Sequence, residues 1–137
     1  MRFMLIRKAA ENTERGDMPT EELIAAMGAY NAQLIAAGAM VDGAGLKPSS
    51  LGARIQIDGV GGKPPAVTDG PFAEIKELVA GFTIINVADK AEAIEWVKRW
   101  PPEDGPVQIE LRQLYEMEDF GDSPAARKMR DDFAKLG

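Results

Sequence analysis

Five short stretches of the chain have the composition and spacing of β-strands: 3–7, 39–42, 53–57, 81–87 and 107–112. In the first, apolar side chains point in both directions, which predicts a strand covered on both faces. In the third, apolar residues alternate with Arg54 and Gln56, which predicts a half-buried strand with these two side chains facing away from the core. The last stretch alternates in the same way and predicts one apolar and one charged face.

Apolar residues recur at helical spacing in three other stretches. The first, about 20–37, begins at Thr20, a residue type that caps helices, and stops at Gly38, which tolerates a left-handed backbone. The second begins at Asp89. There Asp89 and Glu92 have the spacing of a capping box, in which each side chain accepts from the other's backbone N–H. The third follows Ser123 near the end of the chain, and its apolar stripe is expected to pack on the domain or on a second copy.

The elements follow the order strand, helix, strand, strand, long loop, strand, helix, strand, with a further helix at the end. This order predicts an α+β fold of the ferredoxin-like type, in which both central helices cover one face of an antiparallel or mixed sheet. Glycine and proline pairs in 58–65 predict a mobile loop before the chain returns to the sheet. The uncovered sheet face predicts either a homodimer or an enclosed ligand pocket.

Composition narrows the classes of function. The chain has 137 residues, which suits one domain, and it contains neither cysteine nor histidine. A metal site is therefore not expected. The net charge of −6 argues against a nucleic-acid partner. Only four apolar residues lie between the basic residues of the N-terminus, too few for a signal peptide or a membrane span, so we expect a cytoplasmic protein with no membrane partner.

A motif in the middle of the chain resembles the signature of the YCII-related, or DGPF-domain, family. It runs from Thr68 to Glu77 (TDGPFAEIKE) and continues with Gly81-Phe82-Thr83-Ile84. The resemblance extends over about residues 1–115 and leaves 116–137, an acidic connector and the final helix, outside it. It implies a dimeric ferredoxin-like fold of the α+β barrel type, bacterial and cytoplasmic. It also implies a family often without an assigned reaction, some of whose members are linked to alternative sigma factors.

The same resemblance bears on catalysis. Some members of the wider group pair a histidine on the first helix with an aspartate, and here Met27 takes the place of that histidine. Acid–base catalysis would then require a carboxylate or lysine with a shifted pKa. The candidate catalytic residues are Asp42, Asp69 and Glu74. Asp42 and Asp69 also have the chemistry of turn residues, since an aspartate can hydrogen-bond to its neighbouring backbone.

Five residues are candidate ligand-binding residues: Arg54, Asp69, Glu74, Lys76 and Arg112. In this hypothesis the two carboxylates accept hydrogen bonds from a small polar ligand, while the cations hold an anionic oxygen. The alternative is that these charges are solvated on a hairpin. The glycines that follow Asp42 lack the spacing of a dinucleotide fingerprint, so no cofactor is expected.

Three functions remain open. The first is a cofactor-free small-molecule-binding domain with acid–base activity of the isomerase or lyase type. The second is a non-catalytic regulatory or interaction module, for example one associated with a sigma factor. The third is a purely structural dimer, and the sequence does not decide whether the protein is an enzyme.

Overall fold

The computed structural model describes residues 1–136. Its elements are β1 (Arg2–Lys8), α1 (Glu11–Arg15), α2 (Glu21–Ala36), β2 (Met40–Gly45), η1 (Ser49–Leu51), β3 (Ala53–Gln56), β4 (Ala66–Asp69), η2 (Ile75–Glu77), β5 (Val79–Asn86), α3 (Lys90–Lys98), η3 (Pro102–Asp104), β6 (Ile109–Gln113), η4 (Met117–Phe120) and α4 (Pro124–Ala134), where η marks a 3₁₀ turn. In this part of the chain no helix is long and apolar enough to cross a membrane.

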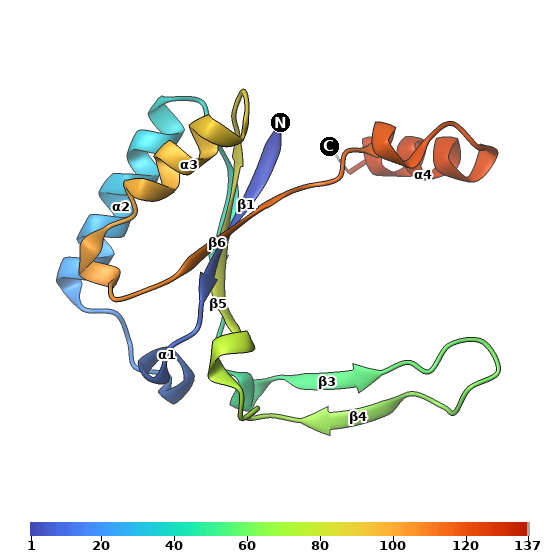
Figure 1. The fold of residues 1–137 in the computed structure, drawn as a ribbon, viewed down its shortest axis with the longest axis horizontal. Helices are drawn as coiled ribbons and strands as arrows, with labels where there is room; N and C mark the ends of the chain where they lie inside the picture. Colours follow the sequence, from blue (N-terminus) through green and yellow to red (C-terminus); the bar gives the residue numbers. More distant parts are fainter. Residues whose placement is uncertain (137) are drawn as a thin grey trace.

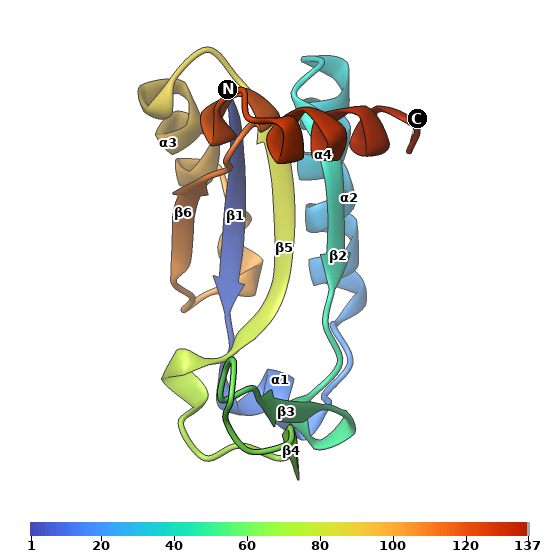
Figure 2. The same ribbon diagram turned by 90° about the vertical axis from the view of Figure 1, so that its right-hand side faces the viewer.

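Four strands form one antiparallel sheet in the order β2-β5-β1-β6. Helices α2 and α3 lie together on one face of this sheet, as Figure 1 shows with the sheet edge-on and Figure 2 shows from the opposite face. Two β-α-β units joined through neighbouring antiparallel strands give this order. The predicted α+β, ferredoxin-like fold is confirmed, and a short additional helix, α1, precedes α2.

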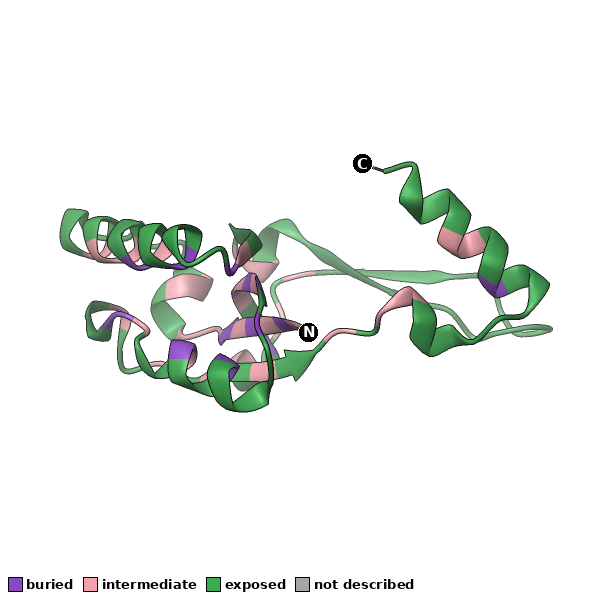
Figure 3. Ribbon diagram, turned by 90° about the horizontal axis from the view of Figure 1, so that it is seen from above, coloured by how far each residue is buried: buried purple, intermediate pink, exposed green. Residues whose placement is uncertain are grey.

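The core lies between the sheet and these two helices, where the buried residues of Figure 3 gather. Phe3 and Leu5 of β1 and Ile85 of β5 pack there against Tyr30, Leu34, Ala93 and Trp96. The Tyr30 hydroxyl donates to the backbone carbonyl of Trp96 at 2.7 Å, and burial raises the pKa of Tyr30 to about 12. The aromatic residues of both helices therefore serve the core.

The predicted helix starts are confirmed with one correction. Thr20 accepts from the backbone N–H of Leu23 at 3.1 Å, and Asp89 accepts from that of Glu92 at 2.9 Å. The Glu92 carboxylate, however, accepts from the backbone N–H of Ala88 and not from that of Asp89. It reaches one residue further back than the expected capping box and fixes the residue before the cap.

The second face of the sheet is open along the described chain. Four apolar side chains lie there in two cross-strand pairs, Met4 with Ile84 and Ile6 with Phe82, and all four are half-buried. The prediction that the first strand is covered on both faces is therefore wrong for the single chain. Its second face carries apolar residues because it is suited to a further layer, which no element of residues 1–136 supplies.

Two arms project on the open side of the sheet, one at each end (Figure 1). The lower arm is the β3–β4 hairpin, whose strands pair only with each other. Every residue of β3 is exposed, and the cross-strand pair Ile55–Val67 is more than half exposed on both sides. The strand expected at 53–57 forms, as β3, but the expectation that it is half-buried is wrong, because no layer lies behind it. The segment expected to be a mobile loop is the hairpin's tip, and β4 is its returning strand.

The upper arm is α4, which forms where the stripe near the C-terminus predicted a helix. Ser123 caps it by accepting from the backbone N–H of Ala126 at 3.1 Å. At its N-terminal end Ala126 is buried and Met129 half-buried, and α4 contacts η4, whereas Phe133 and Leu136 remain 53% and 77% exposed. Only the first half of the stripe therefore packs within the chain. Packing on a second copy remains a prediction.

Candidate functional site

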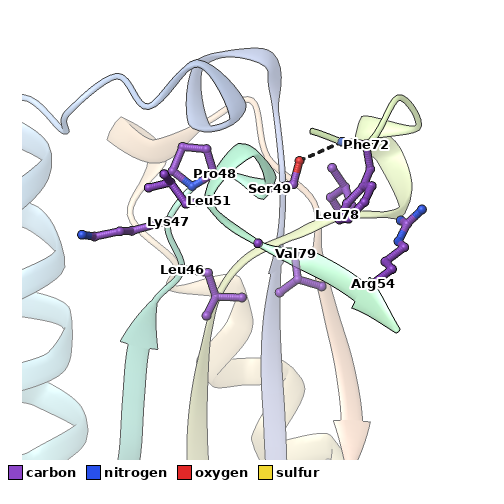
Figure 4. Close-up of a pocket in the computed structure, with 10 residues that line it drawn as sticks. Leu46, Lys47, Pro48, Ser49, Leu51, Arg54, Phe72, Leu78 and Val79 are labelled. Carbon is purple, nitrogen blue, oxygen red and sulfur yellow. Dashed lines mark hydrogen bonds between the residues drawn. The ribbon is translucent and has the colours of Figure 1, made fainter. Parts of the chain in front are cut away.

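A hollow of about 410 Å³ lies at the end of the sheet where β2 ends, β5 begins and the hairpin leaves the body (Figure 4). Its lining comes from three segments that are far apart in the sequence: 46–54, the signature phenylalanine, and the start of β5. The lining residues are Leu46, Lys47, Pro48, Ser49, Leu51, Gly52, Arg54, Phe72, Leu78 and Val79. The site is thus built around the signature motif.

The signature turn is docked against Ser49. The backbone N–H of Gly70 donates to the carbonyl of Gly52 at 3.0 Å, and that of Phe72 donates to the Ser49 hydroxyl at 3.1 Å. Gly70 approaches Ser49 so closely that an added Cβ would collide with the Ser49 carbonyl oxygen. The glycine of the motif is therefore required by a contact between two backbones, and the docked turn carries Phe72 into the hollow.

Phe72 and Arg54, which both line the hollow, stack on each other. The guanidinium carbon of Arg54 lies 3.9 Å from the centroid of the Phe72 ring, so the cation is stacked on the aromatic face. Within residues 1–136 the Arg54 guanidinium makes no hydrogen bond or ion pair. Stacking fixes the plane of the guanidinium and leaves its N–H groups available, which is the arrangement that binds a carboxylate or phosphate through two parallel hydrogen bonds.

The remaining walls are mainly apolar, with a second cation. Leu46, Leu51, Leu78 and Val79 contribute aliphatic surface, and Lys47 adds another positive charge. No carboxylate is among the lining residues. The hollow is therefore cationic and apolar, within a protein whose net charge is −6.

The three candidate catalytic carboxylates lie outside this hollow and are all exposed. Asp42, on β2, accepts from the backbone N–H of Gly43 at 2.8 Å, which is the turn-like bond that its sequence context suggested. Asp69 ends β4 opposite Ala53, and its carboxylate accepts no hydrogen bond within the described chain. The expected cap of the signature turn by Asp69 is thus absent, because the Ser49 contacts hold the turn instead.

The predicted ligand-binding residues do not gather in one place. Arg54 lines the hollow, whereas Lys76 lines a second hollow of about 410 Å³ beside Arg7 and Lys8. Arg112 lies on β6, where it pairs with Glu110 at 3.4 Å on the open face of the sheet. Glu74 is exposed just before η2 and lines neither hollow. Of the five, Arg54 alone lies in the hollow that the signature motif builds.

Reasoning from the sequence missed Lys47, Ser49 and Phe72, which line the hollow, and Glu14, which contacts Ser49 from outside it. Lys47 lies in a Gly-Leu-Lys-Pro turn, and the Pro-Ser-Ser that follows has the chemistry of a turn or cap. Those signals could have indicated a structured turn there. No local signal could have indicated Glu14, which contacts Ser49 from 35 residues away.

Met27, which the resemblance puts in the place of a histidine, is part of the core. Met27 is half-buried on α2 and packs against the core cluster. Its thioether cannot transfer a proton, so this position contributes packing here.

The family model of the YCII-related domain matches residues 1–117, which cover the sheet, α2, α3 and the hollow. No curated protein matches the chain.

Proposed function

This chain belongs to the family of YCII-related domains, and we propose that it binds a small organic anion in the hollow beside Phe72. The observation that carries the proposal is the stacked pair of Arg54 and Phe72, in which the guanidinium is held in a plane with its donors available. The anionic group of the ligand, a carboxylate in the simplest case, accepts from Arg54. The apolar body of the ligand lies against the aliphatic wall of Leu46, Leu78 and Val79.

The lining of the hollow favours binding without catalysis. General acid–base chemistry needs a proton donor or acceptor within hydrogen-bonding reach of the ligand, and no carboxylate or histidine lines the hollow. The titratable side chains that do line it are Lys47 and Arg54, both cations suited to holding negative charge. A ligand-sensing, regulatory role therefore fits the site better than isomerase or lyase activity.

We further propose that the functional unit is a homodimer in which a second copy covers the open face of the sheet. The apolar side chains Met4, Ile6, Phe82 and Ile84 occupy the middle of this face. Charged side chains lie at the two edges of this face: Asp42 on β2, in the same row as Arg112 on β6, and Glu110 on β6, which pairs with Arg112 at 3.4 Å. A face with an apolar centre and a charged rim suits a symmetric contact with a second copy. Both arms extend on this side and add exposed apolar residues for the same partner (Figure 3).

The proposed binding is tested by replacing Arg54. Arg54→Gln removes the charge and the forked donors, and loss of charge-assisted hydrogen bonds of this kind weakens binding roughly tenfold to a hundredfold. The probe is phenylacetate, titrated into the protein and followed by the backbone amide signals that line the hollow. Arg99→Gln is the matched control, because Arg99 also stacks on an aromatic ring, that of Trp96 at 4.4 Å, but lies outside the hollow. Equal affinity of the two variants would contradict the proposal.

A further inference from the structure

We propose that Glu14 and Ser49 act as a positioning pair that sets the location of Phe72, and through it the orientation of Arg54. The inference rests on the proposed binding site and adds two residues to it, one of which, Glu14, lies outside the hollow and on a different element. Neither residue hydrogen-bonds to Arg54 within residues 1–136. They act through the aromatic ring on which Arg54 stacks.

The first step is the bond between α1 and η1. The Glu14 carboxylate accepts two hydrogen bonds from Ser49, one from the backbone N–H at 3.0 Å and one from the hydroxyl. Both side chains are half-buried. A carboxylate that accepts from a hydroxyl fixes the direction of the hydroxyl proton, and so also the direction of its lone pairs.

The second step is the bond between η1 and the signature motif. The Ser49 hydroxyl donates its proton to the Glu14 carboxylate, which leaves its lone pairs free to accept. One lone pair accepts from the backbone N–H of Phe72 at 3.1 Å (Figure 4). The contact of Gly70 with the Ser49 carbonyl places the same turn from its other side. The signature turn is therefore held at Phe72 by the Ser49 hydroxyl and at Gly70 by the carbonyl of Gly52, and only a residue without a side chain fits next to the Ser49 backbone.

The third step is the stability of α1 itself, which is only five residues long. Thr13 closes its first turn, since its hydroxyl accepts from the backbone N–H of Ala10 and donates to the carbonyl of the same residue, both at 2.8 Å. Gly16 ends α1 in a left-handed conformation with φ 81°, and Pro48 lies next to it. This short helix is thus built as a rigid support that presents Glu14 to Ser49.

The test has a readout that does not depend on any ligand. The Phe72 ring shifts the NMR signals of the Arg54 side chain upfield for as long as the two are stacked. Ser49→Ala removes the acceptor for Phe72 and should abolish this shift, whereas Ser49→Thr keeps the hydroxyl and should retain it. Glu14→Ala should reproduce the loss without altering the hollow's own lining. Ser50→Ala is the matched control, because the neighbouring Ser50 is exposed and its side chain makes no hydrogen bond within the described residues.

The second readout is the affinity for phenylacetate. Ser49→Ala and Glu14→Ala should each lower it by roughly tenfold, the effect of one lost orienting hydrogen bond, and the double variant should lose little more than either one alone. A folded Ser49→Ala that keeps the Arg54 shift, or that binds phenylacetate as tightly as the parent, would overturn the proposal. If the parent shows the Arg54 shift but does not bind phenylacetate, the proposed function is wrong. The positioning role of Glu14 and Ser49 is then tested by the Arg54 shift in their variants alone.

Discussion

The backbone N–H of Phe72 donates to the hydroxyl of Ser49, a residue 23 positions earlier in the sequence. This bond joins the signature motif to the turn that follows β2 and brings an aromatic ring next to Arg54. Much of the motif is explained by this contact: its glycine allows the approach, and its phenylalanine forms a wall of the hollow. The motif is therefore a docking element that shapes a site, and its aspartate is exposed at the margin.

The close approach of Gly70 to Ser49 predicts that two glycine-to-alanine substitutions change the stability of the protein in opposite directions. Gly70→Ala should destabilise the protein by about 1–3 kcal/mol, because the new methyl group collides with the backbone of Ser49. Gly28→Ala should stabilise it by about 0.5–1 kcal/mol, since Gly28 lies inside α2 with nothing within 4 Å of an added Cβ. Chemical denaturation of both variants checks the sign of each effect, and a neutral Gly70→Ala would show that the turn is not held as described.

Burial of Tyr30 predicts a loss of stability in alkali. Its folded-state pKa of about 12 lies above the usual value of 10.0, so the folded state holds its proton more tightly than the unfolded state. The stabilisation is fully present below pH 10 and decreases as the pH rises from 10 towards 12, by on the order of 2 kcal/mol. Tyr30→Phe has no proton to lose there. Its free energy of unfolding should therefore fall less than that of the parent between pH 10 and 12. If the free energies of the two proteins fall in parallel with pH, the loss of stability does not come from Tyr30.

The ion pair of Arg2 and Glu116 predicts a weaker dependence at acid pH. Hydrogen bonds from Arg2 hold the pKa of Glu116 below its usual value, with the two side chains 2.9 Å apart. Stabilisation by this group is present above the pKa of the unfolded state and is lost as the pH falls through the folded-state pKa. Because the pair is well exposed, we expect less than about 1 kcal/mol. Comparing Glu116→Gln with the parent should show a difference near neutral pH that disappears in acid; a difference that persists in acid would have another cause.

The open sheet face predicts which side chains support a dimer. Light scattering at micromolar concentration should report a homodimer for the parent and a monomer for Ile84→Lys, because the lysine places a charge in the middle of the apolar face. Ile94→Lys is the control, since Ile94 is 37% exposed on α3, in the helical layer on the other side of the sheet. A parent that is monomeric, or an Ile84→Lys variant that remains dimeric, would contradict a dimer formed through this face.

The sequence predicts five strands and two covering helices, because each has a periodic apolar face and the helices have recognisable caps. Four of these strands form the sheet, whereas 53–57 forms the separate hairpin strand β3. Thr20, Asp89 and Ser123 all cap helices where local chemistry placed them. The alternation at 53–57 was misleading, since an apolar stripe has the same spacing whether a strand packs on its own core or awaits another layer. The sequence shows that a face is apolar, and only the fold shows whether anything covers it.

Less of the candidate site than of the fold could be predicted from the sequence. The polar position of Arg54 on an alternating strand identified it as a candidate, but its partner Phe72 was not among the predicted ligand-binding residues. Asp69 and Glu74 were candidates because a carboxylate can bind a ligand or transfer a proton. Both are exposed and lie outside the hollow. The groups that organise the site are a serine and a glutamate whose contact joins distant segments. Such a contact depends on tertiary structure and leaves no local pattern.

We propose above that the hollow binds an organic anion through Arg54. The most direct measurement compares phenylacetate with phenylacetamide, which has nearly the same shape but no charge, by titrating each into the protein and following the amide signals of residues 46–54 and 72. We expect phenylacetate to bind and to shift these signals. Phenylacetamide should bind at least tenfold more weakly, because it cannot make the same charge-assisted hydrogen bonds. Equal binding of both compounds, or signal changes confined to other parts of the chain, would contradict the proposal.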